Sequence, residues 1–496
     1  MKKRILLLFL SVAVMLSGCG GSAAPTEEER FLGESIEDHV LFSDSIEGFV
    51  GDTMPFYDNG KFNVFYLADQ RAGTQGYHPW ALIQTENFTE YEDKGVVIPY
   101  GDDIKDQDIA LGTGSVIKDA QGTYHAFYTG HNDTYSPKEA VMHATSSDLI
   151  TWTKIPEDTF TGNENYSVDD FRDPYVLYVE EDSCYWMLIA TRHDNDGVIA
   201  KYTSTDLKTW SDGGVFFTED LGSGTNLECP TLLKFENKWY LSFSDQWPNR
   251  EVHYRMSDLP NGPFEKPENN IFDGNGFYAG RMETDGNRLF VVGWNPTKDY
   301  HLDENAYNWA GNMVTHELKA SDDGTLSPVV NEDVSSLLSN EISFAPVKMT
   351  NGIKKSDNTY EFSGDKYEVA VFKELLGSYR LEAEISDFSD SDAFGLAFNM
   401  NSESVGNVNI VFNPAEGKIQ FLNTTDLIAG APQSEIDFDF SPDSIKLTAF
   451  IADGVVTVYV NDEAAFTTRM YLSQGMDWGV FGINSKAKWE SFRLYK

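Results

Sequence analysis

The sequence predicts an all-β protein that folds as a five-bladed β-propeller followed by a C-terminal β-sandwich. From residue 39 to 335, short apolar and aromatic runs are separated by Gly, Asp, Asn and Pro, and hardly any segment has the 3.6-residue period of a helix. A pattern of two such runs recurs five times in this part of the chain. Beyond residue 341 the pattern changes to a clean alternation of apolar and polar residues, which is typical of strands with one buried face.

The first 18 residues are predicted to be an export signal. Three basic residues follow the initiator methionine, and the apolar run Ile5–Leu16 behind them is too short to span a bilayer. The run ends in Leu-Ser-Gly-Cys, which resembles a bacterial lipobox and implies lipid modification of Cys19 after cleavage. Residues 19–38 then form a tether. We expect an exported lipoprotein, lipid-anchored at the outer face of the bacterial cell membrane; ordinary cleavage near Ala24 would instead give a secreted protein.

Each of the five repeats consists of a turn, an aromatic strand and a further strand. The aromatic strands fall within residues 60–66, 122–128, 184–189, 238–243 and 288–294. In the second and third repeats the further strand ends in the same Ser-Xxx-Asp-Leu…Thr-Trp pattern, so that Trp152 and Trp210 are 58 residues apart. Repeats of this size made of short strands are typical of propeller blades, which bury their faces against each other. An irregular β-sandwich is the alternative for residues 39–335.

Three acidic residues take equivalent places in these repeats. Asp52, Asp173 and Glu228 stand 14, 16 and 15 residues before the end of the aromatic strand of their own repeat. Ser115 takes the same place in the second repeat, 13 residues before the end of its strand. Equivalent positions in successive blades face the same axis, so we expect these four side chains to ring the mouth of a central channel. Any one of these acids could belong to a turn or an ion pair; the shared position favours a common site.

Three converging carboxylates fit the hydrolysis of a glycosidic bond. A retaining glycosidase needs one carboxylate that attacks the anomeric carbon and one carboxylic acid, about 5–5.5 Å away, that protonates the leaving oxygen. Glu228 is the expected acid, because its neighbours in the sequence are apolar. Asp52 is then the nucleophile, and Asp173, beside Arg172, is expected to bind two sugar hydroxyls. Asp58 is the rival nucleophile, although its surroundings are typical of a hairpin turn.

Two motifs, and their order along the chain, are similar to those of glycoside hydrolase family 32, the family of invertases, inulinases and levanases. The motifs are Arg172-Asp173-Pro174 and Glu228-Cys229-Pro230, and both follow an Asp in the first blade. Supporting matches are Gly114-Ser115, Phe277-Tyr278-Ala279, Trp309-Ala310-Gly311-Asn312, Val458-Tyr459-Val460-Asn461-Asp462 and Arg469. Members of the family join a five-bladed propeller to a β-sandwich, so the resemblance covers nearly the whole chain behind the signal peptide.

The resemblance implies a β-fructofuranosidase or fructanase that releases fructose from sucrose, inulin or levan by double displacement and needs no cofactor. It implies that Asp52 is the nucleophile, Asp173 the transition-state stabiliser and Glu228 the acid/base. It also implies that the fructose pocket is lined by Trp80, Ser115, Arg172 and Tyr278. Two other functions stay open. One is a fructan-binding surface lipoprotein without turnover; the other is an inverting arabino- or xylo-furanosidase of the related propeller type, whose carboxylates are farther apart.

Residues 341–496 are expected to form the β-sandwich, and the boundary with the propeller falls in Asn331–Asn340. The segments Tyr379–Ile385 and Ile445–Ile451 alternate apolar with polar residues, and a two-residue turn leads from the second of them into another such strand. Two acidic clusters of this part could bind calcium or could be solvated loops: Asp387, Asp390 and Asp392, and Asp437, Asp439 and Asp443.

The composition limits the partners of this protein. With 37 Lys and Arg against 79 Asp and Glu, the formal net charge is −42, so we expect no binding to nucleic acid and membrane attachment through the lipid anchor only. Aromatic residues make up 14% of the chain, which suits stacking on sugar rings as well as β-sheet formation. Apart from Cys19, only Cys184 and Cys229 are present, so we expect no disulfide framework. No metal is expected at the active site.

Overall fold

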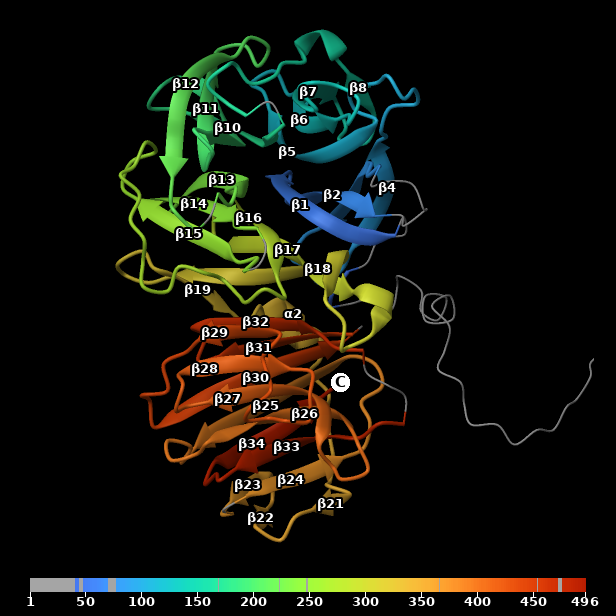
Figure 1. Cartoon of the computed structure of the whole chain (residues 1–496), viewed down its shortest axis with the longest axis vertical. Coiled ribbons are helices and arrows are strands. Elements are labelled where there is room, and N and C mark those ends of the chain that lie inside the picture. Colours follow the sequence, from blue (N-terminus) through green and yellow to red (C-terminus); the bar gives the residue numbers. More distant parts are fainter. Residues whose placement is uncertain are drawn as a thin grey trace, which may run out of the picture. The chain divides into compact units, whose positions relative to one another are not determined.

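The computed structural model describes residues 41–43, 48–69, 77–167, 169–222, 224–246, 249–364, 366–452, 454–471 and 475–496. Within these ranges the protein is nearly all β, as the sequence predicts (Figure 1). None of the helices in them is both long and apolar enough to cross a membrane. The predicted signal peptide at residues 1–18, the lipidation site Cys19 and the tether at 19–38 lie outside the described residues and stay predictions.

Three sheets of the N-terminal part are antiparallel, and in each of them every strand pairs with the next one along the chain (Figure 1). The first contains β5 (Ala110–Lys118), β6 (Tyr124–His131), β7 (Glu139–Ser146) and β8 (Trp152–Lys154). The second contains β9 (Phe171–Val179), β10 (Cys184–His193), β11 (Asp196–Ser204) and β12 (Ser211–Thr218). The third contains β13 (Glu228–Phe235), β14 (Lys238–Ser244) and β15 (Val252–Ser257).

A larger sheet joins the beginning of this part to its end. Its early strands are β1 (Phe49–Asp58), β2 (Lys61–Asp69), β3 (Trp80–Thr85) and β4 (Glu92–Ile98). Its late strands are β16 (Tyr278–Thr284), β17 (Leu289–Lys298), β18 (Tyr307–Ala320) and β19 (Leu326–Val329). The two groups meet where Val50 of β1 pairs with Gly311 of β18. The aromatic strands of the five predicted repeats are β2, β6, β10, β14 and β17, so the sequence placed them correctly.

The first strands of the five strand groups pack on one another in a cycle. β1 lies against β5, β5 against β9, β9 against β13, β13 against β16, and β16 against β1. Each of these strands also has a β-bulge, in which two of its residues lie opposite one residue of the next strand. The bulged pairs are residues 51–52, 112–113, 173–174, 229–230 and 279–280. A bulge bends the strand and redirects its side chains, so five strands change direction at equivalent places.

The C-terminal part contains two antiparallel sheets whose side chains share one buried core. One sheet contains β22 (Ile353–Ser356), β23 (Thr359–Phe362), β34 (Lys488–Tyr495), β25 (Tyr379–Ser386), β30 (Ser444–Ala452), β31 (Val455–Val460) and β32 (Ala464–Arg469), with β20 (Glu341–Ile342) paired to β34. The other contains β21 (Lys348–Met349), β24 (Tyr367–Phe372), β33 (Trp478–Ile483), β26 (Ala393–Met400), β27 (Gly406–Asn413), β28 (Lys418–Leu422) and β29 (Ser434–Asp437). The predicted alternating segments are β25 and β30, and their apolar residues enter this core.

Helical segments in the described ranges are short. They are the 3-10 turns η2 (Pro156–Asp158) and η3 (Asp299–His301) and the helix α2 (Glu332–Leu337). Helix α2 lies inside the predicted domain boundary, and the side chain of Asn331 caps it by accepting hydrogen bonds from the backbone N–H groups of Asp333 and Val334.

Arg469, at the end of β32, ties the C-terminal part to β17 and β18. Its buried guanidinium donates to the carbonyl oxygens of Asn295 and Pro296, at 3.0 Å each, and to Oδ1 of Asn312 at 2.6 Å. These acceptors are buried, so the one arginine satisfies polar groups that would otherwise be desolvated without a partner. Cys184 and Cys229 are free thiols, in agreement with the expected absence of a disulfide framework.

Candidate active site

Asp52 lies in the bulge of β1 and accepts hydrogen bonds on both carboxylate oxygens. The Thr113 hydroxyl donates to Oδ2 at 2.9 Å, and the Trp294 indole N–H donates to Oδ1 at 3.1 Å. Burial raises the pKa of Asp52, and the charge of Glu228 raises it further, whereas the two donors act to lower it. At the neighbouring Gly51, a Cβ atom would lie 2.3 Å from the ring of Trp309, so only glycine fits there. Asp52 is therefore a fixed, desolvated carboxyl group.

Asp173 lies in the bulge of β9, in a left-handed backbone conformation with φ of 59°. Its side chain is buried, and Oδ2 accepts a hydrogen bond of 2.9 Å from the backbone N–H of Cys229 in β13. Its own backbone N–H donates to the Thr129 hydroxyl at 3.0 Å. Left-handed φ is uncommon for residues other than glycine, and the contacts from β6 and β13 fix it here. The result is that Asp173 is joined to the strand that carries Glu228.

Glu228, the first residue of β13, has hydrogen-bond partners on both oxygens of its side chain. Oε1 accepts from Arg172 Nη2 at 3.0 Å and from Gln246 Nε2 at 2.8 Å. Oε2 lies 2.7 Å from the Tyr278 hydroxyl, which also lies 2.8 Å from the carbonyl oxygen of Asp245. The single hydrogen of that hydroxyl can go to a Glu228 carboxylate, or it can go to Asp245 while a protonated Glu228 donates to the Tyr278 oxygen. Both protonation states of Glu228 therefore have a partner, as an acid/base requires.

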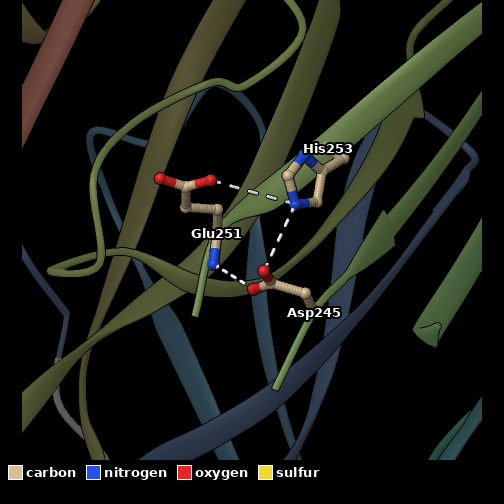
Figure 2. Close-up of side chains that lie close together, drawn as sticks. All are labelled: Asp245, Glu251 and His253. Atoms are coloured by element: carbon tan, nitrogen blue, oxygen red, sulfur yellow. Dashed lines mark hydrogen bonds and ion pairs between the residues drawn. The ribbon is translucent and has the colours of Figure 1, made fainter. Parts of the chain in front are cut away.

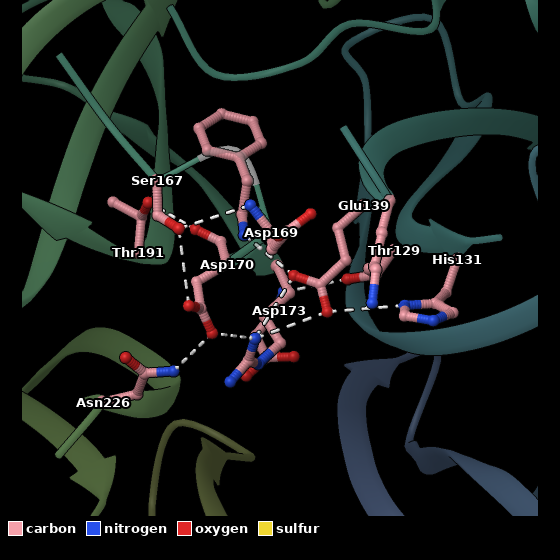
Figure 3. Close-up of polar contacts among 12 residues, drawn as sticks. Thr129, His131, Glu139, Ser167, Asp169, Asp170, Asp173, Thr191 and Asn226 are labelled. Atoms are coloured by element: carbon pink, nitrogen blue, oxygen red, sulfur yellow. Dashed lines mark hydrogen bonds and ion pairs between the residues drawn. The ribbon is translucent and has the colours of Figure 1, made fainter. Parts of the chain in front are cut away.

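Arg172 orients Glu228 and is itself held by two other acids. Its Nη1 lies 2.8 Å from Asp170 Oδ1 and 3.2 Å from Glu139 Oε2. Figure 3 shows this polar cluster, in which Asn226 also donates to Asp170, at 3.0 Å. Burial acts to raise the pKa of Glu139, yet His131 and Arg172 outweigh it and keep that pKa below its usual value. The guanidinium is thus fixed between ionised partners and presents Nη2 to Glu228.

The three acids lie close enough to influence one another electrostatically. Burial is the main cause that raises the pKa of Asp173; Arg172 and Arg281 oppose it, and the charge of Asp52 adds to it. Arg281 of β16 also acts on Asp52, and its Nη2 lies 3.5 Å from the carbonyl oxygen of Asp173. The structure therefore brings Asp52, Asp173 and Glu228 into one site, with two buried cations beside them.

Of the four predicted pocket residues, Arg172 and Tyr278 contact Glu228, whereas the other two have different surroundings. Trp80 is 0% exposed, and its indole N–H donates to the carbonyl oxygen of Gly112 at 2.9 Å. The Ser115 hydroxyl accepts from the backbone N–H of Val176 at 2.9 Å and thereby joins β5 to β9. Contact of Trp80 and Ser115 with a substrate stays a prediction.

Asp58, the rival nucleophile, lies at the far end of β1. Its Oδ2 accepts from Lys118 at 2.9 Å and from the Tyr124 hydroxyl at 2.7 Å. Burial acts to raise the pKa of Asp58, but these two donors outweigh it and lower the pKa. Asp58 is thus an ion-paired residue of the strand end, and Asp52 is the aspartate of β1 that faces Glu228.

Sequence reasoning missed several residues that position the carboxylates. Thr113 and Trp294 hold Asp52, Gln246 holds Glu228, and Arg281 lies beside Asp52 and Asp173. A positional signal was available for three of them. Thr113 directly precedes the Gly114-Ser115 motif, Trp294 ends the aromatic strand of the fifth repeat, and Gln246 follows that of the fourth.

A carboxyl group held by two donors, a second one that can pass a proton to a hydroxyl, and a third one beside them are the parts of a glycosidase site. The protein is a glycosidase, which hydrolyses O-glycosyl bonds. Residues 48–327 match the model of the glycosyl hydrolases family 32 N-terminal domain, and residues 324–487 match the GH32, BT1760-like, C-terminal domain. The chain belongs to glycosyl hydrolases family 32.

Curated relatives are similar over most of their length. A raffinose invertase of Escherichia coli is 25% identical over 84% of this chain and 85% of its own. A levanbiose-producing levanase of Bacillus subtilis (strain 168) is 23% identical over 84% of this chain and 82% of its own. Among solved structures, an exo-inulinase from Aspergillus awamori superposes with a TM-score of 0.71 at 17% identity, covering 92% of this chain and 97% of that one. The fold is therefore shared with enzymes of this family.

Proposed function

We propose that this protein is a retaining β-fructofuranosidase or fructanase that releases fructose from sucrose or from fructans such as inulin and levan. The observation that supports it best is the joint position of Asp52 and Glu228, each with partners on both carboxyl oxygens and each within electrostatic reach of the other. The invertase and levanases similar to this chain supply the substrate class.

In the first half of the reaction Asp52 attacks the anomeric carbon of the fructosyl unit. Glu228 gives its proton to the glycosidic oxygen as the bond from that oxygen to the anomeric carbon breaks, and a fructosyl ester of Asp52 forms. In the second half, Glu228 takes a proton from water, the water oxygen attacks the same carbon, and the ester bond to Asp52 breaks. Two inversions restore the original configuration, so the product is retained.

Asp173 is the proposed transition-state stabiliser. Its side chain is anchored through Oδ2 on Cys229, which leaves Oδ1 for sugar hydroxyls. A fixed carboxylate beside the ring opposes the positive charge of an oxocarbenium-like transition state. Arg172 and Tyr278 would contact the sugar from the Glu228 side, with Trp80 and Ser115 completing the proposed fructose pocket.

The proposed architecture follows the same sheets. The five strand groups that begin with β1, β5, β9, β13 and β16 would be the blades of a five-bladed propeller spanning residues 39–335, with the bulged first strands around its axis. The two sheets of residues 341–496 would be a β-sandwich, which fits their common core.

We also propose that residues 1–18 direct export and that Cys19 is lipidated, so that the enzyme is anchored at the outer face of the cell membrane. The basic start, the short apolar run and the Leu-Ser-Gly-Cys ending support this. Incorporation of labelled palmitate at Cys19 tests it. Unmodified protein in the medium would instead identify a secreted enzyme.

The test of the function is product analysis with sucrose, inulin, levan and an aryl arabinofuranoside. We expect free fructose from at least one of the first three. Release from the arabinofuranoside alone would favour the inverting furanosidase, and fructan binding without any turnover would favour a binding lipoprotein. Either result would overturn the proposal.

A further inference from the structure

We infer that Asp245, Glu251 and His253 form a binding site for a divalent transition-metal ion, best matched by Zn²⁺. The three side chains lie where β14 ends and β15 begins (Figure 2). The site is separate from the reacting carboxylates, and its metal affinity does not depend on the proposed function. One imidazole nitrogen with two carboxylate oxygens is a donor set that Zn²⁺ accepts, with water filling the remaining position.

The backbone brings the three residues together. Ser244 pairs with Val252 at the end of the β14–β15 ladder, so Asp245 and Glu251 are the next residues on either side. The N–H of Asp245 donates to the carbonyl oxygen of Glu251 at 3.1 Å, and the N–H of Glu251 donates to Oδ1 of Asp245 at 2.6 Å. The second bond leaves Oδ2 of Asp245 turned toward His253.

The distances are close to those of a zinc site. His253 Nε2 lies 3.6 Å from Asp245 Oδ2 and 3.9 Å from Glu251 Oε2, and the three donor atoms all lie within 4.8 Å of one another. Zn²⁺ bonds to nitrogen and oxygen are about 2.0–2.2 Å long, which puts tetrahedral ligand atoms about 3.4 Å apart. Small rotations of the side chains, and above all of the half-buried Glu251, would therefore close the site around an ion.

The tautomer of His253 is fixed from the opposite side of the ring. Arg255 Nη1 donates to Oδ1 of Asn270 at 3.0 Å, which identifies that atom as the amide oxygen. His253 Nδ1 lies 3.3 Å from the same oxygen, so Nδ1 must carry the hydrogen. A metal-binding histidine usually donates its other N–H to such an acceptor. Nε2 then directs a lone pair toward two carboxylates, unless a proton or a metal ion lies between them.

His253 Nε2 is a buried polar atom without a hydrogen-bond partner among the described residues, and the residue is only 6% exposed. Burial, followed by the charge of Asp245, raises the pKa of Glu251, although His253 and Lys418 act in the opposite direction. The Lys418 ammonium lies 3.3 Å from Glu435 and 2.8 Å from Asp437, so its charge is already shared. A bound cation would balance the negative charge of the cluster.

The site is connected to the acid/base. The carbonyl oxygen of Asp245 lies 2.8 Å from the Tyr278 hydroxyl, and the adjacent Gln246 donates to Glu228. A metal ion that fixes Asp245 would fix both partners of Glu228 at once. The three ligands would thus act as positioning residues for Glu228, and they take no part in the bond-breaking steps.

Binding of Zn²⁺ to the purified full chain at pH 7, measured by isothermal titration calorimetry after dialysis against EDTA, tests the proposal. We expect one Zn²⁺ per chain and an affinity at least tenfold weaker for His253→Gln and for the milder Glu251→Gln. The matched control is His193→Gln, which removes a half-exposed histidine beside Asp194 and should bind as the unchanged chain does. No saturable binding, which is the result expected if His253 is simply a protonated ion-pair partner, would overturn the proposal, as would equal affinity of His253→Gln.

Thermal unfolding gives an independent readout, because an ion that binds only the folded state raises the melting temperature. We expect Zn²⁺ to raise the melting temperature of the EDTA-treated chain and to leave that of Glu251→Gln unchanged. We further expect EDTA to lower kcat more than it raises KM. The same melting temperature with and without Zn²⁺ would contradict the site, whatever the activity of the enzyme.

Discussion

Replacement of Tyr278 by Phe removes one hydroxyl from the acid/base and leaves the ring in place. The ring packs against Trp294, with centroids 5.7 Å apart, and under the guanidinium of Arg250, at 4.5 Å, and both contacts survive the change. A hydrogen bond to a charged group is worth about 1.5–3 kcal/mol. Because the one hydrogen is shared between Glu228 and Asp245, we take the lower part of this range, which corresponds to about a 10- to 30-fold decrease in kcat.

Steady-state kinetics on the best fructoside, with kcat and KM separated, is the assay. Tyr178→Phe is the matched control, because that ring is exposed and lies against Tyr185 on β10. We expect the control to keep the kcat of the unchanged enzyme. A Tyr278→Phe enzyme with kcat within about twofold of the unchanged enzyme would refute the reasoning, because the hydroxyl would then contribute less than a normal hydrogen bond.

Three further predictions concern the pH dependence and the stability of the enzyme. Thr113→Val removes a donor that lowers the pKa of Asp52, so the acid limb of kcat/KM should move to higher pH; Thr113→Ser should keep it in place. Burial raises the pKa of Glu283 from 4.5 to about 7, so the folded state binds a proton in this window and stability falls as pH rises through it. Glu283→Gln should therefore narrow the gap in melting temperature between pH 5 and pH 8; an unchanged gap would speak against it. Arg469→Met leaves three buried acceptors without a donor and should cost about 3 kcal/mol or more in chemical denaturation, so a loss under about 1 kcal/mol would contradict the proposed tie between β32 and β17.

The sequence located the three acids because the repeat pattern fixes where each sheet begins. Asp52, Asp173 and Glu228 lie in or directly beside the bulges of β1, β9 and β13, and the first strands of these sheets pack on one another. A fixed distance to the end of the aromatic strand is visible in the sequence without any knowledge of the bulge. The aromatic strands and the alternating strands of the C-terminal part were found for the same reason, since their periods are regular.

The partners of these acids could not be predicted in the same way. A bulge places two residues opposite one and so interrupts the alternation from which a side chain's direction is inferred. In β5 the bulge covers residues 112–113, and Thr113 contacts Asp52 while Ser115 contacts Val176 of β9. Trp80 illustrates a different limit. An aromatic residue in a strand is equally compatible with a buried ring and with one that stacks on a sugar, and only the three-dimensional packing shows that Trp80 is fully enclosed.

The cluster of Asp245, Glu251 and His253 was not predicted from the sequence either. Its ligand atoms come together through the ladder between β14 and β15 and through the acceptor on Asn270, which is remote from the pattern of the repeats. The acidic clusters that the sequence did suggest, in residues 387–392 and 437–443, consist of consecutive loop positions. Spacing along the chain reveals such loops more readily than it reveals donors on neighbouring strands.

The central claim is that Asp52 attacks the anomeric carbon, and trapping of the covalent intermediate tests it most directly. In a Glu228→Gln enzyme supplied with fructosyl fluoride, the leaving group needs no acid, but no base activates water, so the ester should accumulate. Acid quenching followed by peptide mass mapping should find one fructosyl residue on Asp52. A fructosyl residue on Asp58, or no labelled peptide together with product of inverted configuration, would contradict the mechanism.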